Sequence, residues 1–210
     1  MKLTRILALW LAAVPTVACA QATSSAPTKT TPSAPADHVV YVIGKCNFRI
    51  NDLHGGTFSA DKESGGYTGL EAKNNPAFTA YCHAGTSQND LDEQLDIKQA
   101  NGKLVWSGNG MPFSPPQHFQ LRKFAGKNWS GTSVGYDMTE GPEERRQRLF
   151  LYCLIETKGS QVLCGNAEAG QPSSPATSKT IQKILAVLKS VEFVDPSTAA
   201  ANPASAATVH

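Results

Sequence analysis

The sequence lacks an excess of either charge. It contains 19 lysine and arginine residues against 17 aspartate and glutamate residues. Two of the basic residues, Lys2 and Arg5, lie in a leader described below, so removal of the leader leaves 17 residues of each sign. Proteins that bind nucleic acid usually carry a basic excess, and attraction to anionic lipid also needs basic clusters. The composition therefore argues against a nucleic-acid partner.

Beyond the leader, the sequence also lacks a long apolar run. A helix needs about 20 apolar residues to cross a membrane, and no stretch after residue 20 approaches this length. We therefore expect no transmembrane segment after cleavage of the leader.

Motifs for cofactors and metals are missing as well. There is no phosphate-binding loop, dinucleotide fingerprint or paired-carboxylate motif. His54, His83 and His118 are not at the spacing of a zinc site. The acidic run from Asp90 does not match a calcium loop, because it has no glycine at the sixth position and no glutamate at the twelfth. We predict no cofactor and no metal.

One pattern resembles a catalytic motif. "GTSVG", residues 131–135, has the spacing of a nucleophile elbow, with Ser133 in the central place. That elbow needs a following helix and a later histidine. The sequel "YDMTEGPEE" is not helical in character, and the later histidine is His210 at the end of the chain. The prediction is an ordinary strand serine and no catalytic residue.

The first twenty residues have the features of an export signal. A basic start precedes the apolar run "ILALWLAAVPTVA", and small residues follow it. Cleavage before Gln21 would release the chain, whereas cleavage before Cys19 would leave a thiol for lipidation. Residues 21–38 are rich in Ala, Ser, Thr and Pro and are predicted to be a disordered linker. We expect a periplasmic or secreted protein, with an outer-membrane lipoprotein as the alternative.

Four further cysteines indicate disulfides, since exported chains are exposed to an oxidising compartment. Two disulfides allow three pairings. The hairpin pattern "RLFLYCLIETKGSQVLCGN" puts Cys153 opposite Cys164, which leaves Cys46 to pair with Cys82. Either a two-residue or a four-residue turn at "TKGS" is compatible with a cross-strand bond, and the four-residue turn gives the closer pair.

Residues 39–195 are predicted to be one domain, followed by a disordered tail at 196–210. Strands are expected in 38–50, 77–85, 118–124 and 129–137, with a hairpin around Asn101-Gly102. Residues 51–77, dense in Gly, Asn, Asp and Ser, are expected to form a long loop.

A single helix is predicted near the C-terminus, capped by Ser178. Its apolar stripe consists of Ile181, Ile184, Leu185 and Leu188. "VEFV" follows as a last strand. The fold class is therefore α+β: a mostly antiparallel sheet with one C-terminal amphipathic helix packed on it and two disulfides.

These features favour a non-catalytic binding module of bacterial type that acts on another envelope protein. An inhibitor, an assembly accessory and a ligand binder are not distinguished. The alternative is a hydrolase of envelope polymers. It requires His54, His83, Asp90 and Glu93 to converge in one cleft.

Overall fold

The computed structural model describes residues 39–69 and 77–197. The predicted leader, the linker with Cys19, and the tail beyond Ser197 lie outside the described residues. The strands are β1 (Val40–Ile43), β2 (Cys46–Ile50), β3 (Thr57–Ala60), β4 (Ser64–Thr68), β5 (Phe78–His83), β6 (Ile97–Ala100), β7 (Lys103–Trp106), β8 (Gln120–Ala125), β9 (Trp129–Asp137), β10 (Arg148–Glu156), β11 (Val162–Glu168) and β12 (Val191–Phe193). The helices are α1 (Gln88–Gln94) and α2 (Pro175–Lys189), with short 3-10 turns η1 (Pro115–Gln117) and η2 (Glu143–Arg145).

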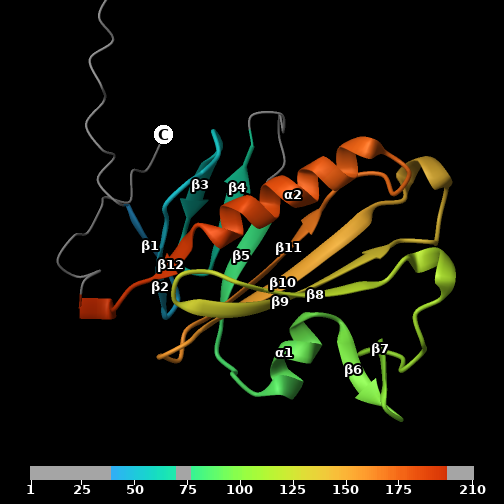
Figure 1. Cartoon of the computed structure of the whole chain (residues 1–210), viewed down its shortest axis with the longest axis horizontal. Coiled ribbons are helices and arrows are strands. Elements are labelled where there is room, and N and C mark those ends of the chain that lie inside the picture. Colours follow the sequence, from blue (N-terminus) through green and yellow to red (C-terminus); the bar gives the residue numbers. More distant parts are fainter. Residues whose placement is uncertain (1–38, 70–76, 198–210) are drawn as a thin grey trace, which may run out of the picture. The chain divides into compact units, whose positions relative to one another are not determined.

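The strands form three antiparallel sheets, which confirms the predicted α+β class. The large sheet has the order β3-β4-β5-β11-β10-β9-β8, the small sheet has the order β1-β2-β12, and β6 pairs with β7 alone. Figure 1 shows α2 on one side of the large sheet and α1 with the β6–β7 hairpin on the other. No helix in the described part of the chain has both the length and the apolar character needed to span a bilayer.

Alternation along the central strands builds two cores. On β10, Phe150, Tyr152 and Leu154 face α2, because successive side chains of a strand point to opposite faces. Their neighbours Leu149, Leu151, Cys153 and Ile155 belong to the cluster on the α1 side. The strand is therefore buried on both sides along most of its length.

The core on the α2 side also includes the small sheet. Ile184, Val187 and Leu188 of α2 pack with Phe48 and Phe193 in one buried cluster. The disulfide Cys46–Cys82 links β2 of the small sheet to β5 of the large sheet, with 5.5 Å between the Cα atoms. This bond therefore joins the two sheets covalently.

The second disulfide confirms the predicted register of the β10–β11 hairpin. Cys153 lies opposite Cys164, with the Cα atoms 4.1 Å apart. The Glu156 N–H donates to the Gln161 carbonyl, which makes the cysteines a non-hydrogen-bonded pair. The chain thus adopts the four-residue turn, the alternative that brings the two cysteines closer.

Two further hairpins agree with the sequence. Ile97 pairs with Trp106 around Asn101 and Gly102, whose φ angles of 51° and 74° are the positive values that such a turn needs. Strands β8 and β9 pair as expected.

The predicted long loop at 51–77 was wrong in part. Strands β3 and β4 lie within it, although residues 70–76 are outside the described residues. Phe58 and Tyr67 point into the α2-side core, and the Tyr67 ring stacks on Phe78. Aromatic packing in three dimensions therefore orders a segment whose glycine content predicts a loop.

The prediction of a single helix was also wrong. The acidic run at 90–96 contributes most of α1, in which Leu91 is buried, and Leu95, the C-cap residue, is buried as well. Asp92 is buried and accepts a hydrogen bond from Gln88. Helix α2 begins at Pro175 with Ser174 as its N-cap, so Ser178 lies inside the helix.

Candidate functional site

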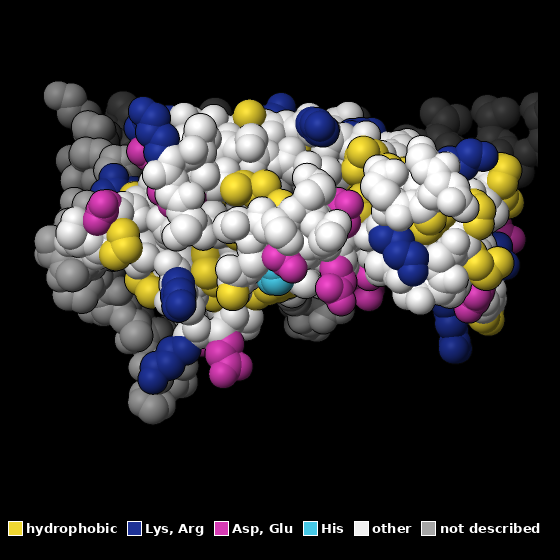
Figure 2. Space-filling view, turned by 90° about the horizontal axis from the view of Figure 1, so that it is seen from below, with side chains coloured by type: hydrophobic (Ala, Val, Ile, Leu, Met, Phe, Trp, Pro, Cys, Tyr) yellow, Lys and Arg dark blue, Asp and Glu magenta, His cyan; other side chains and the backbone are white. Residues whose placement is uncertain are grey.

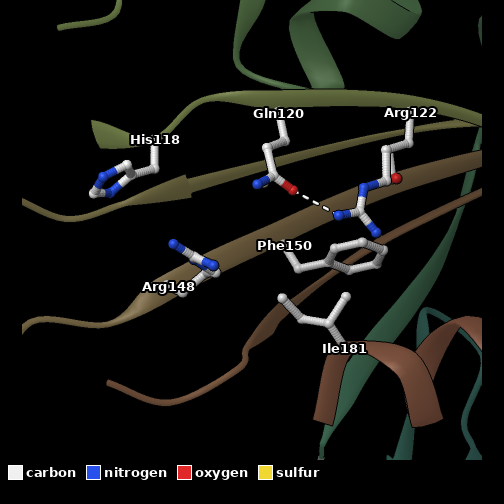
Figure 3. A pocket seen from close by; sticks show the side chains of 8 residues that line it. His118, Gln120, Arg122, Arg148, Phe150 and Ile181 are labelled. Carbon is white, nitrogen blue, oxygen red and sulfur yellow. Dashed lines mark hydrogen bonds between the residues drawn. The ribbon is translucent and has the colours of Figure 1, made fainter. Parts of the chain in front are cut away.

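The structure forms a groove on the α2 side of the large sheet, between β8 and α2. It is shallow, with about 10 Å³ of space, which is room for roughly one water molecule. We call it the β8 groove, lined by His118, Gln120, Arg122, Ser133, Gly135, Arg148, Phe150 and Ile181. Figure 3 shows His118 and Arg148 at one end and Arg122, Phe150 and Ile181 at the other.

The sequence of β9 creates the hollow. Ser133 and Gly135 point to the α2 side, opposite Arg122 and Gln120 of β8. Because Ser133 has a small side chain and Gly135 has none, the surface of the sheet is recessed at these two positions. Phe150 and Ile181 supply an apolar wall, so the groove combines polar and apolar contacts.

One end of the groove is a buried ion pair. The register of β9 and β10 sets Asp137 opposite Arg148. Arg148 donates from Nε to Oδ1 at 2.5 Å and from Nη2 to Oδ2 at 2.7 Å. The Asp137 side chain is only 4% exposed. The paired geometry is the bidentate one that guanidinium and carboxylate favour.

Asp137 also holds His118. His118 Nδ1 lies 2.8 Å from Asp137 Oδ2. Burial opposes ionisation of Asp137, but the hydrogen bonds from Arg148 and His118 hold its pKa below the usual value. The carboxylate can only accept, so Nδ1 carries the proton and donates. The hydrogen bond from Arg148 in turn raises the pKa of this arginine.

The backbone helps to place the imidazole. His118 ends η1 in the left-handed region, with φ of 44° and ψ of 44°. Its N–H donates to the Pro115 carbonyl. This conformation is uncommon for residues other than glycine, although histidine tolerates it better than most. With this backbone conformation, His118 lies beside Asp137 just before β8 begins. The His118 side chain is 66% exposed at the groove.

Arg122 differs from Arg148 in having no carboxylate. It donates to Gln120 Oε1 at 2.7 Å, and no ion pair includes it within the described residues. Since Asp137 neutralises Arg148, the net charge of the groove comes from Arg122, with His118 adding to it when protonated. Planar guanidinium groups suit carboxylate and phosphate ligands. The groove is thus suited to an anionic group flanked by an apolar one.

Ser133 lies in the groove but not beside the histidine. It sits in the middle of β9 and is buried, as expected for a strand serine. It is four residue steps along the extended strand, about 13 Å, from Asp137, which accepts the hydrogen bond from His118. The arrangement is not a nucleophile–base pair.

The residues of the hydrolase hypothesis occupy different elements. His54 follows β2, and its ring contacts the Asp52 carboxylate. The backbone N–H of Asp52 donates to the hydroxyl of Ser190, the C-cap residue of α2. His83 ends β5, whereas Asp90 and Glu93 belong to α1, on the opposite face of the sheet from α2. No hydrogen bond or ion pair joins any two of these four side chains, all of which the structure describes.

The face beneath the large sheet carries both signs of charge. Figure 2 views this side, and its basic and acidic side chains are interspersed with exposed apolar ones. A second, open groove adjoins α1 there, lined in part by Asp92, Glu93 and Lys98. Within 39–69 and 77–197, no three His, Cys, Asp or Glu side chains gather into a group that could hold a metal ion.

Sequence reasoning missed the groove. The run 142–148 is expected to be a solvated turn, but Arg148 at its end is only 18% exposed and bonded to Asp137. The β9–β10 pairing that brings them together has no local signal. No family model, curated protein or solved structure matches this chain.

Proposed function

We propose that this protein is exported and acts as a non-catalytic binding module on another protein of the cell envelope. The β8 groove is the binding site, and an anionic side chain of the partner is its ligand. The observation that carries the proposal is Arg122, an exposed guanidinium without a carboxylate partner among the described residues, beside an apolar wall.

Export to an oxidising compartment agrees with the two disulfides, because such bonds persist mainly outside the cytosol. The periplasm or the exterior is the proposed location, and an outer-membrane lipoprotein anchored through Cys19 is the alternative. The balanced composition supports a protein partner over nucleic acid.

The test is capture from an envelope extract of the native host with the tagged full chain. Wild-type protein should recover a stoichiometric partner. Arg122→Gln should weaken capture about tenfold, since hydrogen bonds to charged groups contribute about 1.5–3 kcal/mol. Lys103→Gln is the matched control, because it removes one exposed positive charge from the β6–β7 hairpin, outside the groove.

Equal capture by wild type and Arg122→Gln would refute the groove as the binding site. Turnover of an envelope polymer by the purified chain, lost on substitution of His83 or Glu93, would favour the hydrolase instead.

A further inference from the structure

Strand β8 is an open edge of the large sheet. It terminates the strand order, and five of its six residues are exposed. An edge strand carries a row of backbone N–H and C=O groups that are available to another chain. At the opposite edge, β3 is shorter, with four residues, and the Lys62 carbonyl of its hairpin turn accepts from Gly44 of the small sheet.

The hydrogen bonds to β9 show which β8 groups face outward. Gly126 donates its N–H to the Trp129 carbonyl, directly beyond the end of β8. Hydrogen-bonded pairs alternate along an antiparallel ladder. Gln120, Arg122 and Phe124 therefore bond to β9. The backbone groups of Leu121, Lys123 and Ala125 point away from the sheet.

Cations flank this edge on both faces. Arg122 projects to the α2 side with the groove, and Lys123 projects to the α1 side. Both side chains are exposed. Leu121, on the same face as Lys123, is 41% exposed. A strand added here would meet a positive charge on each face and an apolar side chain on one.

We propose that β8 binds an acidic, extended segment of the partner by strand addition. This inference rests on the proposed function and names the form of the ligand. Main-chain hydrogen bonds from Leu121, Lys123 and Ala125 hold the segment. Acidic side chains of the segment lie next to Arg122 and Lys123, on the groove side and the α1 side respectively.

The charges also argue against a second copy of this chain as the occupant. An antiparallel pair of β8 strands would set Lys123 opposite Lys123 of the other copy in one register, and Arg122 opposite Arg122 in the next. Like charges across a strand pair are destabilising, and lysine on an edge strand is a common device against self-association.

A synthetic peptide in which pairs of glutamates alternate with pairs of valines is the probe, because adjacent residues of a strand face opposite sides and both faces then carry an acidic side chain. Fluorescence anisotropy measures its affinity for the full chain. Lys123→Pro should weaken binding about tenfold or more, because proline removes one outward N–H and blocks the edge. Proline leaves the β8–β9 ladder complete, since this N–H does not bond to β9. Lys123→Gln, which keeps the N–H, should lose only about threefold. A lysine–valine peptide should bind at least about tenfold more weakly.

Amide hydrogen exchange on the wild-type chain needs no variant. The peptide should slow exchange at Leu121, Lys123 and Ala125, whereas Arg122 and Phe124 are already bonded to β9. Unchanged exchange, or equal binding by wild type and Lys123→Pro, would overturn strand addition. The proposed function would then still be decided by capture with Arg122→Gln. A wild-type dimer that Lys123→Pro converts to monomer would show instead that a second copy occupies the edge.

Discussion

The buried carboxylate at the end of the groove gives the sharpest stability prediction. Asp137→Asn keeps the size of the side chain but removes its charge. It leaves Arg148 facing an amide, whose oxygen can replace one carboxylate acceptor but whose NH2 group, a donor, cannot replace the other. The change therefore isolates the ion pair from side-chain packing.

The cost follows from burial and geometry. Removing one member of a fully buried ion pair costs about 3–5 kcal/mol. The Asp137 side chain is 4% exposed but that of Arg148 is 18% exposed, so water can partly solvate the Arg148 guanidinium once its carboxylate partner is removed. We therefore expect Asp137→Asn to lower the free energy of unfolding by about 2–3 kcal/mol at neutral pH.

The direction of the pKa shift sets the pH dependence. Hydrogen bonds from Arg148 and His118 outweigh burial and lower the pKa of Asp137, so the folded chain binds this proton less tightly than the unfolded chain. The stabilisation is complete above the ordinary aspartate pKa of about 4 and is lost as pH falls through the lower folded value. The variant lacks the titrating group, so its stability should fall less in acid.

Urea unfolding of both proteins across neutral and acidic pH is the assay. Glu140→Gln is the control, because it removes one exposed negative charge and should change stability by no more than about 0.5 kcal/mol. A difference between wild type and Asp137→Asn that stays constant from neutral to strongly acidic pH would refute the electrostatic explanation.

The remaining predictions concern covalent and steric constraints. Cys46→Ser with Cys82→Ser should cost about 4 kcal/mol and Cys153→Ser with Cys164→Ser about 3 kcal/mol, since the bridged residues are 36 and 11 positions apart. Urea unfolding that ranks the two pairs in the reverse order would contradict this chain-entropy argument. Gly165→Ala should destabilise the sheet by about 3 kcal/mol, because a Cβ there meets the Thr79 carbonyl and the Tyr152 ring. Gly102→Ala, which meets no atom within 4 Å but has φ of +74°, should cost only about 1 kcal/mol in thermal unfolding, and equal losses would contradict the steric account.

Features set by neighbouring residues could be predicted from the sequence. The Asn101-Gly102 turn fixes the β6–β7 register, and the spacing around "TKGS" places Cys153 opposite Cys164. The second disulfide then follows by elimination. Each of these inferences involves strands that are adjacent along the chain.

Features that depend on distant packing could not be predicted in the same way. Strands β3 and β4 contain glycines that predict a loop, yet Gly65 leaves room for Phe58 and Ile43 to reach the core. Helix α1 did carry a local signal, because Ser87 caps it and Leu91 and Leu95 share one face. Because α1 has only seven residues and several of them are acidic, its apolar pattern is too short to stand out in the sequence.

The β8 groove also depends on packing between residues that are distant in the sequence. Asp137 and Arg148 meet only because β9 and β10 pair over nine residues, and His118 joins them from the turn before β8. Isolated arginines in a chain of balanced charge give no sign of such a groove. The open edge of β8 is likewise a property of strand order and not of composition.

Amide hydrogen exchange at β8, measured with the partner recovered by capture, tests the central claim most directly. The account predicts slowed exchange at Leu121, Lys123 and Ala125 when wild-type protein binds the partner, and little change at the same amides in Arg122→Gln. Protection confined to other elements, with exchange on β8 unchanged in the bound wild-type protein, would contradict it.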